Sequence, residues 1–311
     1  MKRNIIFSVA VLLVAAGVFF ANCGLAAPAS EKVTHPFIAQ CFRACKICIV
    51  SAKGEIEWEY PARYVQDVWK LPNGNILFCH LTGAKEVTIK DKKVVWEYKA
   101  PKVKGLEIHS CQPLPNGNVL ICECGTSRLI EVDRKGKIVK EIKLTTTVKK
   151  PHNQFRMARK TAKGTYVVGF TGEGVVKELD GAGKIVRTID LKAMGIKSAK
   201  LHGVLRLKNG NTLITTGGTG TIVEVDPKDK VVWKFEPKDQ PEGFKCKFVC
   251  GVQRLGNGNT VVSWYGGNPQ FFEITPDKKV VWQVYDKRFS AVSGLFLLDA
   301  KGDATKGEVL K

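Results

Sequence analysis

KLPNGNILFCHLTGAKEVTIKDKKVVWEYKAP, residues 70–101, is the first of five copies of one 32-residue pattern in this chain. The other copies begin at Pro113, Lys160, Arg206 and Arg254, so successive copies start 43, 47, 46 and 48 residues apart. Each copy holds a few short strands that cannot bury a hydrophobic face alone. The copies must therefore stack on one another, as in a repeat protein whose units surround a common axis.

The turns inside each copy predict antiparallel hairpins. An Asn-Gly turn such as Asn73-Gly74 precedes an apolar strand, and a second strand alternates apolar and polar residues, as over residues 222–226. A third strand follows a polar turn such as residues 227–230. Asn-Gly between β-branched runs is a strong hairpin signal. With one more strand before the first turn, each unit becomes a four-stranded antiparallel sheet, the size of a propeller blade.

The two ends of the chain together predict a sixth unit. Residues 37–61 align with residues 76–100 of the next copy but lack the innermost strand and the Asn-Gly turn, and residues 293–302 resemble that missing piece. A C-terminal strand that completes the N-terminal blade would close the ring and remove exposed sheet edges. We therefore expect an all-β, six-bladed β-propeller over residues 37–302, with seven blades as the main alternative.

The N-terminus has the layout of a secretory signal peptide. Lys2 and Arg3 precede an apolar run over residues 5–21, which is followed by small residues. We expect a signal peptide over residues 1–26, a linker over 27–36 and a C-terminal tail over 303–311, in a secreted or periplasmic monomer. The alternatives are a retained N-terminal anchor or lipidation at Cys23. No later segment is apolar over the ~20 residues that a membrane span requires.

The chain is strongly basic. Its formal charge is +20, and removal of Lys2 and Arg3 with the signal peptide would leave +18. A net positive field favours acidic partners, including acidic polysaccharides. Many lysines lie in the polar turns, however, where they would simply keep a strand-rich surface soluble. We expect no nucleic-acid partner, because an exported protein without an aromatic and basic binding motif is a poor candidate.

The number of cysteines is unusual for an exported protein, because it would be uneven after signal cleavage. Ten cysteines are present and nine would remain after signal cleavage, so at least one lacks an intramolecular partner. Cys41, Cys79 and Cys122 occupy the same repeat position, which suits a small side chain that fills space between blades. A cross-strand disulfide between Cys111 and Cys122 is the sharper alternative. It requires a two-residue turn, because a longer loop would shift the register.

Histidines gather at one predicted face of the propeller. Alignment on the turns places Gln66, His109, Arg156 and His202 at the starts of innermost strands, with His152 just upstream of Arg156. The connections between second and third strands return to the same face, so their side chains should meet these residues around the mouth of the central channel. These connections contribute His80, Glu123, Trp264 and Tyr265.

This set of side chains has three interpretations. Neutral imidazoles bind metals and work as general acids or bases, so His109, His152 and His202 could hold one divalent metal. Histidines with Arg156 could instead clamp an anionic group without any metal. The simplest interpretation is polar side chains that satisfy one another in a packed channel. Trp264 and Tyr265 could add a stacking platform for a sugar.

The recurring Leu-Pro-Asn-Gly-Asn-Ile/Val-Leu, Glu-Val-Asp and Lys-Val-Val-Trp-Glu-Tyr segments resemble the repeats of secreted bacterial PQQ-like β-propeller proteins. They are also similar to those of arylsulfotransferase-like propellers, and the resemblance covers residue 37 to about residue 302. It implies a nucleophilic histidine with histidine and arginine around a sulfuryl group, and His109, His202, His152 and Arg156 are of the right type. Quinoprotein dehydrogenases usually carry adjacent cysteines, which this chain lacks. We therefore expect no PQQ.

Two function classes follow. In the first, the protein binds a small anionic or carbohydrate ligand at the mouth. In the second, the same residues perform catalysis, either as a metal-assisted polysaccharide lyase or in arylsulfotransferase-like group transfer. A propeller scaffold hosts unrelated functions, so the fold does not choose between these classes. Binding is the preferred prediction, because the sequence contains no specific catalytic spacing.

Overall fold

The computed structural model of the protein describes residues 34–196, 200–246 and 248–301, and these residues form six four-stranded antiparallel sheets. The first blade contains β1 (Phe37–Cys41), β2 (Lys46–Val50), β3 (Ile56–Pro61) and β24 (Val292–Leu297). The second contains β4 (Val65–Lys70), β5 (Ile76–His80), β6 (Gly83–Val87) and β7 (Val94–Lys99). The third contains β8 (Glu107–Pro113), β9 (Val119–Cys124), β10 (Arg128–Val132) and β11 (Ile138–Lys143).

The remaining three blades follow the same plan. The fourth contains β12 (Phe155–Lys160), β13 (Tyr166–Phe170), β14 (Val175–Leu179) and β15 (Ile185–Asp190). The fifth contains β16 (Val204–Arg206), β17 (Thr212–Thr215), β18 (Ile222–Val225) and β19 (Val231–Phe235). The sixth contains β20 (Val249–Arg254), β21 (Thr260–Trp264), β22 (Phe271–Ile274) and β23 (Val280–Val284). Two short 3₁₀ helices, η1 (Pro151–Asn153) and η2 (Pro237–Asp239), lie in connections between blades.

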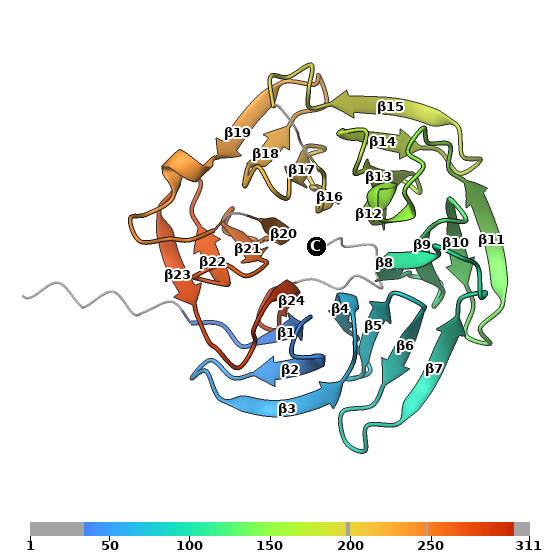
Figure 1. Cartoon of the computed structure of the whole chain (residues 1–311), viewed down its shortest axis with the longest axis horizontal. Helices are drawn as coiled ribbons and strands as arrows, with labels where there is room; N and C mark the ends of the chain where they lie inside the picture. The colour runs from blue at the N-terminus through green and yellow to red at the C-terminus, as the bar shows by residue number, and fades with distance from the viewer. Residues whose placement is uncertain (1–33, 197–199, 247, 302–311) are drawn as a thin grey trace, which may run out of the picture. The chain divides into compact units, whose positions relative to one another are not determined.

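The six sheets form the expected closed propeller. The innermost strands β24, β4, β8, β12, β16 and β20 contact one another in this order around the centre (Figure 1). β24 pairs antiparallel with β1, from Phe37 opposite Leu297 to Gln40 opposite Gly294. The C-terminal strand thus completes the N-terminal blade, which confirms the six-bladed architecture. Because β1 and β24 pair with each other, both ends of the repeat array are held by backbone hydrogen bonds.

The axis of the ring is packed with polar side chains below its mouth. Asp67 on β4 and Arg159 on β12 are 1% and 0% exposed, and Arg159 Nη2 lies 2.9 Å from Asp67 Oδ2. The guanidinium also lies over the ring of Trp69, 5.0 Å from its centroid. The space beside this pair measures only about 10 Å³. The centre is therefore closed by a buried ion pair and is not an open channel.

A recurring glutamate, buried in four of five blades, joins neighbouring blades near the opposite rim. Glu224 on β18, for example, accepts a 2.6 Å hydrogen bond from Asn211 in its own blade and lies 2.6 Å from Arg254 Nη2 in the next. Three equivalent glutamates meet an arginine or lysine of the following blade in the same way, and a fourth meets a histidine from the segment before β1. These pairs are Glu86 with Arg134, Glu131 with Lys160, Glu178 with Arg206 and Glu273 with His35.

The partner of Glu273 in the last of these pairs, His35, comes from the segment before the first strand. His35 Nε2 lies 2.8 Å from Glu273 and its Nδ1 lies 2.8 Å from Asp299. Burial alone would lower the pKa of His35, but these two carboxylates raise it above its ordinary value. His35, the one histidine that the sequence did not place at the mouth, therefore links the sixth and first blades and does not line the mouth.

The loop between β8 and β9 is longer than the two-residue turn that a disulfide between Cys111 and Cys122 would require. Leu114 N donates to Asn118 O and Pro113 pairs with Val119, so Cys111 lies opposite Ile121 and Cys122 lies opposite Ser110. The side chains of Cys111 and Cys122 consequently point to opposite faces of the blade. All nine described cysteines are free thiols, and eight of them are buried. Their small volume fills space within and between blades.

Three of the expected segments lie largely outside the described residues. They are the signal peptide over 1–26, most of the linker over 27–36 and the tail over 303–311, including Cys23. Within the described residues, no helix has the length and hydrophobicity needed to cross a membrane.

Candidate functional site

A pocket of about 340 Å³ opens at one mouth of the propeller. Its floor comes from residues at the starts of innermost strands, where a blade's first side chains point toward the axis. Its walls come from η1 and from connecting loops. We call it the mouth pocket, and its lining residues are Phe42, Gln66, His152, Arg156, His202, Phe248, Cys250, Tyr265 and Ser293.

Four side chains beside this pocket form a closed ring of contacts, which we call the imidazole cluster: Glu107, His109, His152 and Arg156. Arg156 Nη1 lies 2.7 Å from His109 Nδ1, and Arg156 Nη2 lies 2.6 Å from His152 Nε2. Glu107 Oε2 lies 3.0 Å from His109 Nε2 and 2.7 Å from His152 Nδ1. Two imidazoles are thus held between one guanidinium and one carboxylate.

The chemistry of arginine decides where the imidazole protons reside. A guanidinium only donates hydrogen bonds, so His109 Nδ1 and His152 Nε2 must present lone pairs to Arg156. The remaining proton of each neutral ring then lies on the nitrogen that faces Glu107, and both rings donate to the same carboxylate oxygen. The four shorter contacts of the cluster, at 2.6–3.0 Å, are all satisfied when both histidines are neutral. Two longer contacts of His109, both 3.3 Å, do not fit this arrangement: Nδ1 with Gln66 Oε1 and Nε2 with Arg156 Nη1.

Burial and charge both keep His109 neutral. His109 is 4% exposed, and burial followed by the nearby Arg156 lowers its pKa to about 4, against the opposing effect of Glu107. The hydrogen bond from His109, opposed by burial and assisted by His152, lowers the pKa of Glu107 to about 2. At neutral pH the cluster therefore contains one carboxylate, one guanidinium and two neutral rings.

Arg156 carries a charge that no carboxylate touches. Among the described residues, its contacts within hydrogen-bond distance are the two neutral imidazoles, which use two of its five N–H groups. Burial lowers the pKa of this guanidinium, and no charged partner offsets that desolvation by direct contact. The mouth pocket therefore holds a partly desolvated cation with unused donors.

His202 faces the pocket from the fifth blade. Its Nδ1 is buried and has no hydrogen-bond partner among the described residues. Burial, followed by the charge of Arg156, lowers its pKa well below the ordinary value. His202 is thus a neutral ring that lines the pocket beside Phe248.

Aromatic rings form the other wall. Phe42 contacts Tyr265 with ring centroids 5.9 Å apart, and Phe248 contacts both Tyr265 at 6.4 Å and His202 at 5.8 Å. Arg43 lies over the Tyr265 ring from the rim, 5.8 Å from its centroid. The pocket consequently combines a cationic side with an aromatic side, which suits a ligand that has both an anionic group and a ring.

The structure brings together most of the predicted site residues. Gln66, His152, Arg156, His202 and Tyr265 line the mouth pocket, and His109 lies directly behind Arg156. Glu107, Phe42 and Phe248 are also at the site but were missed by the sequence analysis. Glu107 could have been predicted from the sequence, because it precedes His109 by two residues and residues two apart on a strand share a face.

Three predicted residues lie elsewhere. Trp264 is 0% exposed and stacks on Phe272 between blades, so it cannot offer a ring face to a ligand, and the expected two-ring platform reduces to Tyr265. Glu123 is also 0% exposed and accepts hydrogen bonds from Tyr98, Thr126 and Arg128.

His80 is the third. It contacts Thr82 on the second blade and does not line the mouth pocket. Burial, with a smaller effect of Lys85, lowers its pKa.

The expected set of three metal-binding histidines is not assembled as predicted. Within the described residues, the one group of potential ligand atoms that all lie within 4.8 Å of one another is Glu107, His109 and His152. His202, which precedes β16 in the neighbouring fifth blade, is not in this group. The carboxylate of Glu107 takes the place that was expected for His202.

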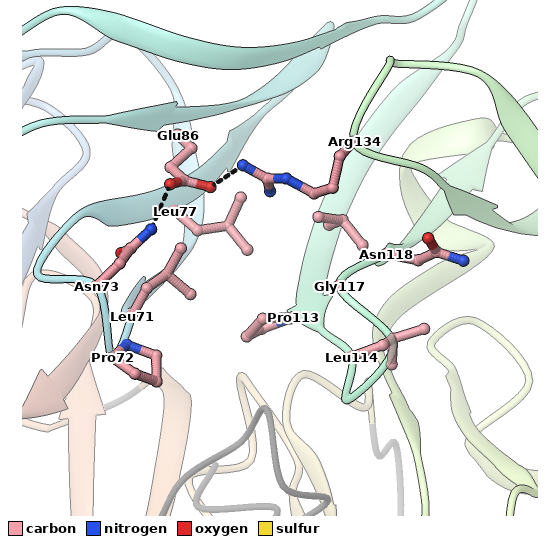
Figure 2. Close-up of a pocket in the computed structure, with 11 residues that line it drawn as sticks. Leu71, Pro72, Asn73, Leu77, Glu86, Pro113, Leu114, Gly117, Asn118 and Arg134 are labelled. Carbon is pink, nitrogen blue, oxygen red and sulfur yellow. Dashed lines mark hydrogen bonds and ion pairs between the residues drawn. The ribbon is translucent and has the colours of Figure 1, made fainter.

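A second pocket, of about 410 Å³, lies at the opposite rim between the second and third blades (Figure 2). Leu71, Pro72 and Leu114 line it, and its charged groups are already paired. Glu86 lies 2.5 Å from Arg134 and accepts a 3.0 Å hydrogen bond from Asn73. Because this pocket offers no unused charge, the mouth pocket is the better candidate site.

Thiol reactivity should follow burial. Cys45 is the one partly exposed cysteine among the described residues, whereas burial raises the pKa of buried thiols such as Cys79 and Cys122. In a Cys23→Ser background, we expect Ellman's reagent to modify Cys45 rapidly in the folded protein and the other thiols only upon unfolding. Cys45→Ser should abolish the rapid phase. A rapid phase that survives this substitution would contradict the burial pattern.

Comparison with known proteins identifies the family. Residues 37–239, which are 203 of the 311 residues, match the Mal s 1 allergenic protein-like family. The chain belongs to the Mal s 1 allergenic protein-like family. No curated protein matches the sequence. The expected resemblance to propeller repeats is confirmed at the level of the fold, whereas the specific likeness to PQQ-like and arylsulfotransferase-like proteins stays a prediction.

Solved structures similar to this family member are also propellers. A protein of unknown function from Bacteroides caccae is 29% identical with a TM-score of 0.75, covering 86% of this chain and 100% of that one. A catalytically inactive histidine-to-alanine variant of virginiamycin B lyase from Staphylococcus aureus, with quinupristin, is 13% identical with a TM-score of 0.59, covering 87% and 97%. A streptogramin B lyase is 16% identical with a TM-score of 0.55, covering 82% and 73%. At these lower identities the two lyases show the fold alone.

Proposed function

We propose that the protein binds a small anionic ligand in the mouth pocket, with Arg156 as the anchor of the negative group. The observation that carries this proposal is a guanidinium that lines the pocket, that no described carboxylate contacts, and that retains unused N–H donors. Burial of a charge without a counter-ion is unfavourable, and an anionic ligand would relieve it. Arginine is also the side chain best suited to bidentate contact with carboxylate, sulfate or phosphate groups.

The rest of the pocket favours a ligand with a ring. Phe42, Phe248 and Tyr265 provide apolar faces opposite Arg156, and Gln66 and Ser293 provide polar groups near the floor. A sugar acid, a sulfated sugar or an aromatic acid combines these features. A volume of about 340 Å³ suits one or two such rings, which includes the end of an acidic polysaccharide.

Paired ligands that differ in one charge provide the test. We expect galacturonate to bind the full-length protein in isothermal titration calorimetry and galactose to bind much more weakly, and benzoate to behave likewise relative to benzyl alcohol. Arg156→Gln should weaken anion binding about 10- to 100-fold, because a hydrogen bond to a charged group contributes ~1.5–3 kcal/mol.

Arg63→Gln is the matched control. Arg63 is exposed beside Tyr64 at the same rim, so its removal changes the net charge equally without touching the imidazole cluster. Equal affinity for charged and neutral partners, or equal loss in both arginine variants, would contradict a specific anion site.

Catalysis is the second candidate function, and one observation favours it. His152 Nδ1 donates to Glu107 while its Nε2 faces only Arg156, so an anion that draws Arg156 away would release Nε2 as a base oriented by a carboxylate. The Staphylococcus aureus lyase shares the fold, and its histidine-to-alanine variant is catalytically inactive. With oligogalacturonate, Nε2 would remove the proton next to the carboxylate and the glycosidic oxygen would leave and take a proton from water, which gives an unsaturated sugar end. With an aryl sulfate and a phenol acceptor, the products would be the free phenol and the sulfated acceptor. His152→Gln should abolish these products while binding persists.

Export completes the proposal. The basic and apolar N-terminus supports secretion or transfer to a periplasm, with cleavage after Ala26. Expression of the full chain in a bacterial host, followed by mass spectrometry of the exported fraction, tests this. An intact N-terminus retained in the cytoplasm would contradict export.

A further inference from the structure

Three side chains of the imidazole cluster have the composition and spacing of a metal site. Glu107, His109 and His152 each offer one ligand atom, and these atoms all lie within 4.8 Å of one another. Glu107 Oε2 lies 3.0 Å from His109 Nε2 and 2.7 Å from His152 Nδ1, which approaches the separation of two ligand atoms on one ion. Two imidazoles and one carboxylate form a ligand set that zinc and neighbouring divalent ions accept, with a position left open.

Arg156 blocks this site by controlling the tautomers. Because the guanidinium donates to His109 Nδ1 and His152 Nε2, the two ring protons lie on the nitrogens that point at Glu107. A metal needs lone pairs on those same nitrogens. Each ring would have to move its proton to its other nitrogen, where it would meet the N–H groups of Arg156. Donor would then face donor at both contacts.

The positive charge of Arg156 opposes the metal as well. The guanidinium lies within hydrogen-bond distance of both rings, so a divalent ion at Glu107 would be separated from it by little more than one imidazole. Removal of Arg156 from the rings therefore removes two obstacles together, the wrong tautomers and the adjacent like charge.

We propose that Glu107, His109 and His152 form a divalent transition-metal site that Arg156 keeps closed. Metal enters when the guanidinium leaves the two rings. If the proposed anion binding is correct, an anion that attracts Arg156 opens the site, and anion and metal then raise each other's affinity reciprocally. The metal site itself does not depend on that function, and its test uses metal alone.

The test is titration of the metal-free full-length protein with Co²⁺, monitored by visible absorption and calorimetry, and repeated with Zn²⁺. Arg156→Met replaces the guanidinium with a side chain of similar length that cannot donate, and Arg156→Leu serves if that variant does not fold. We expect either variant to bind one metal ion about 100-fold more tightly than the wild type, because two charge-assisted hydrogen bonds no longer oppose the metal. Arg63→Met, which removes an exposed charge at the same rim, should bind like the wild type.

A second substitution identifies the ligands. Arg156→Met combined with His152→Asn should lose the added affinity, and since His152 is exposed this change should leave the fold intact. The proposal is overturned if Arg156→Met binds no more tightly than the wild type, or if the double variant binds as tightly as Arg156→Met. It is also overturned if the bound Co²⁺ shows thiolate charge-transfer absorption, which would place the ion on cysteine. None of these outcomes depends on anion binding by the wild type, so the two proposals fail separately.

Discussion

Arg159→Leu is expected to lower the free energy of unfolding by roughly 3–5 kcal/mol, as removal of one partner from a buried ion pair typically does. The substitution would leave the Asp67 carboxylate buried beside the axis without its cation. It would also remove donors to the backbone carbonyls of Cys111 and Ala158, which lie 3.4 and 3.0 Å from Arg159 Nη1. Urea denaturation of the wild type and the variant measures the change.

Two further variants make this prediction specific. Arg187→Leu removes an arginine that pairs with the half-exposed Asp229 on the outer side of the ring, and it should lower stability by only about 1 kcal/mol or less. Asp67→Leu combined with Arg159→Leu should be less destabilised than the sum of the single variants, because no unpaired charge remains. Similar losses for Arg159→Leu and Arg187→Leu would show that the central pair has no special role.

Acid is expected to destabilise the protein through His109. The pKa of His109 is lowered to about 4 in the folded state, mainly by burial, whereas an unfolded histidine titrates near 6.5. Between these values the unfolded state binds more protons, so stability falls as the pH falls through this window. The shift corresponds to on the order of 3 kcal/mol. His202, whose pKa burial also lowers, contributes with the same sign.

Stability measured by urea denaturation at pH 7, 5.5 and 4.5 tests this expectation. His109→Gln retains a donor and an acceptor but cannot titrate, so its stability should fall less steeply with acid than that of the wild type. His35→Gln should behave in the opposite way. The pKa of His35 is raised by Glu273 and Asp299, so this histidine adds stability below pH 6.5 that the variant lacks. Identical pH slopes in the wild type and His109→Gln would contradict the assignment.

Alignment of the repeats predicted much of the candidate site. It placed Gln66, Arg156 and His202 at strand starts that face the axis, and all three line the mouth pocket. It failed where a strand ends and a loop begins. Trp264 is the last residue of β21 and packs between blades, while Tyr265 follows it and turns into the pocket. A core side chain and a pocket-lining side chain are thus adjacent in the sequence, because successive strand residues point in opposite directions.

The sequence by itself determined the architecture: the number of blades, their antiparallel strands and the closure of the ring by β24. These properties follow from turn chemistry and from strand alternation, which are local and are repeated five times. Only the tertiary structure decided which polar atoms meet. Glu107, His109, His152 and Arg156 come from two blades and a connecting 3₁₀ helix, and their contacts depend on a β-bulge in β8 and on where η1 lies. Contacts of 2.6–3.0 Å depend on such local irregularities. A repeat alignment shows only what the copies have in common and therefore cannot predict them.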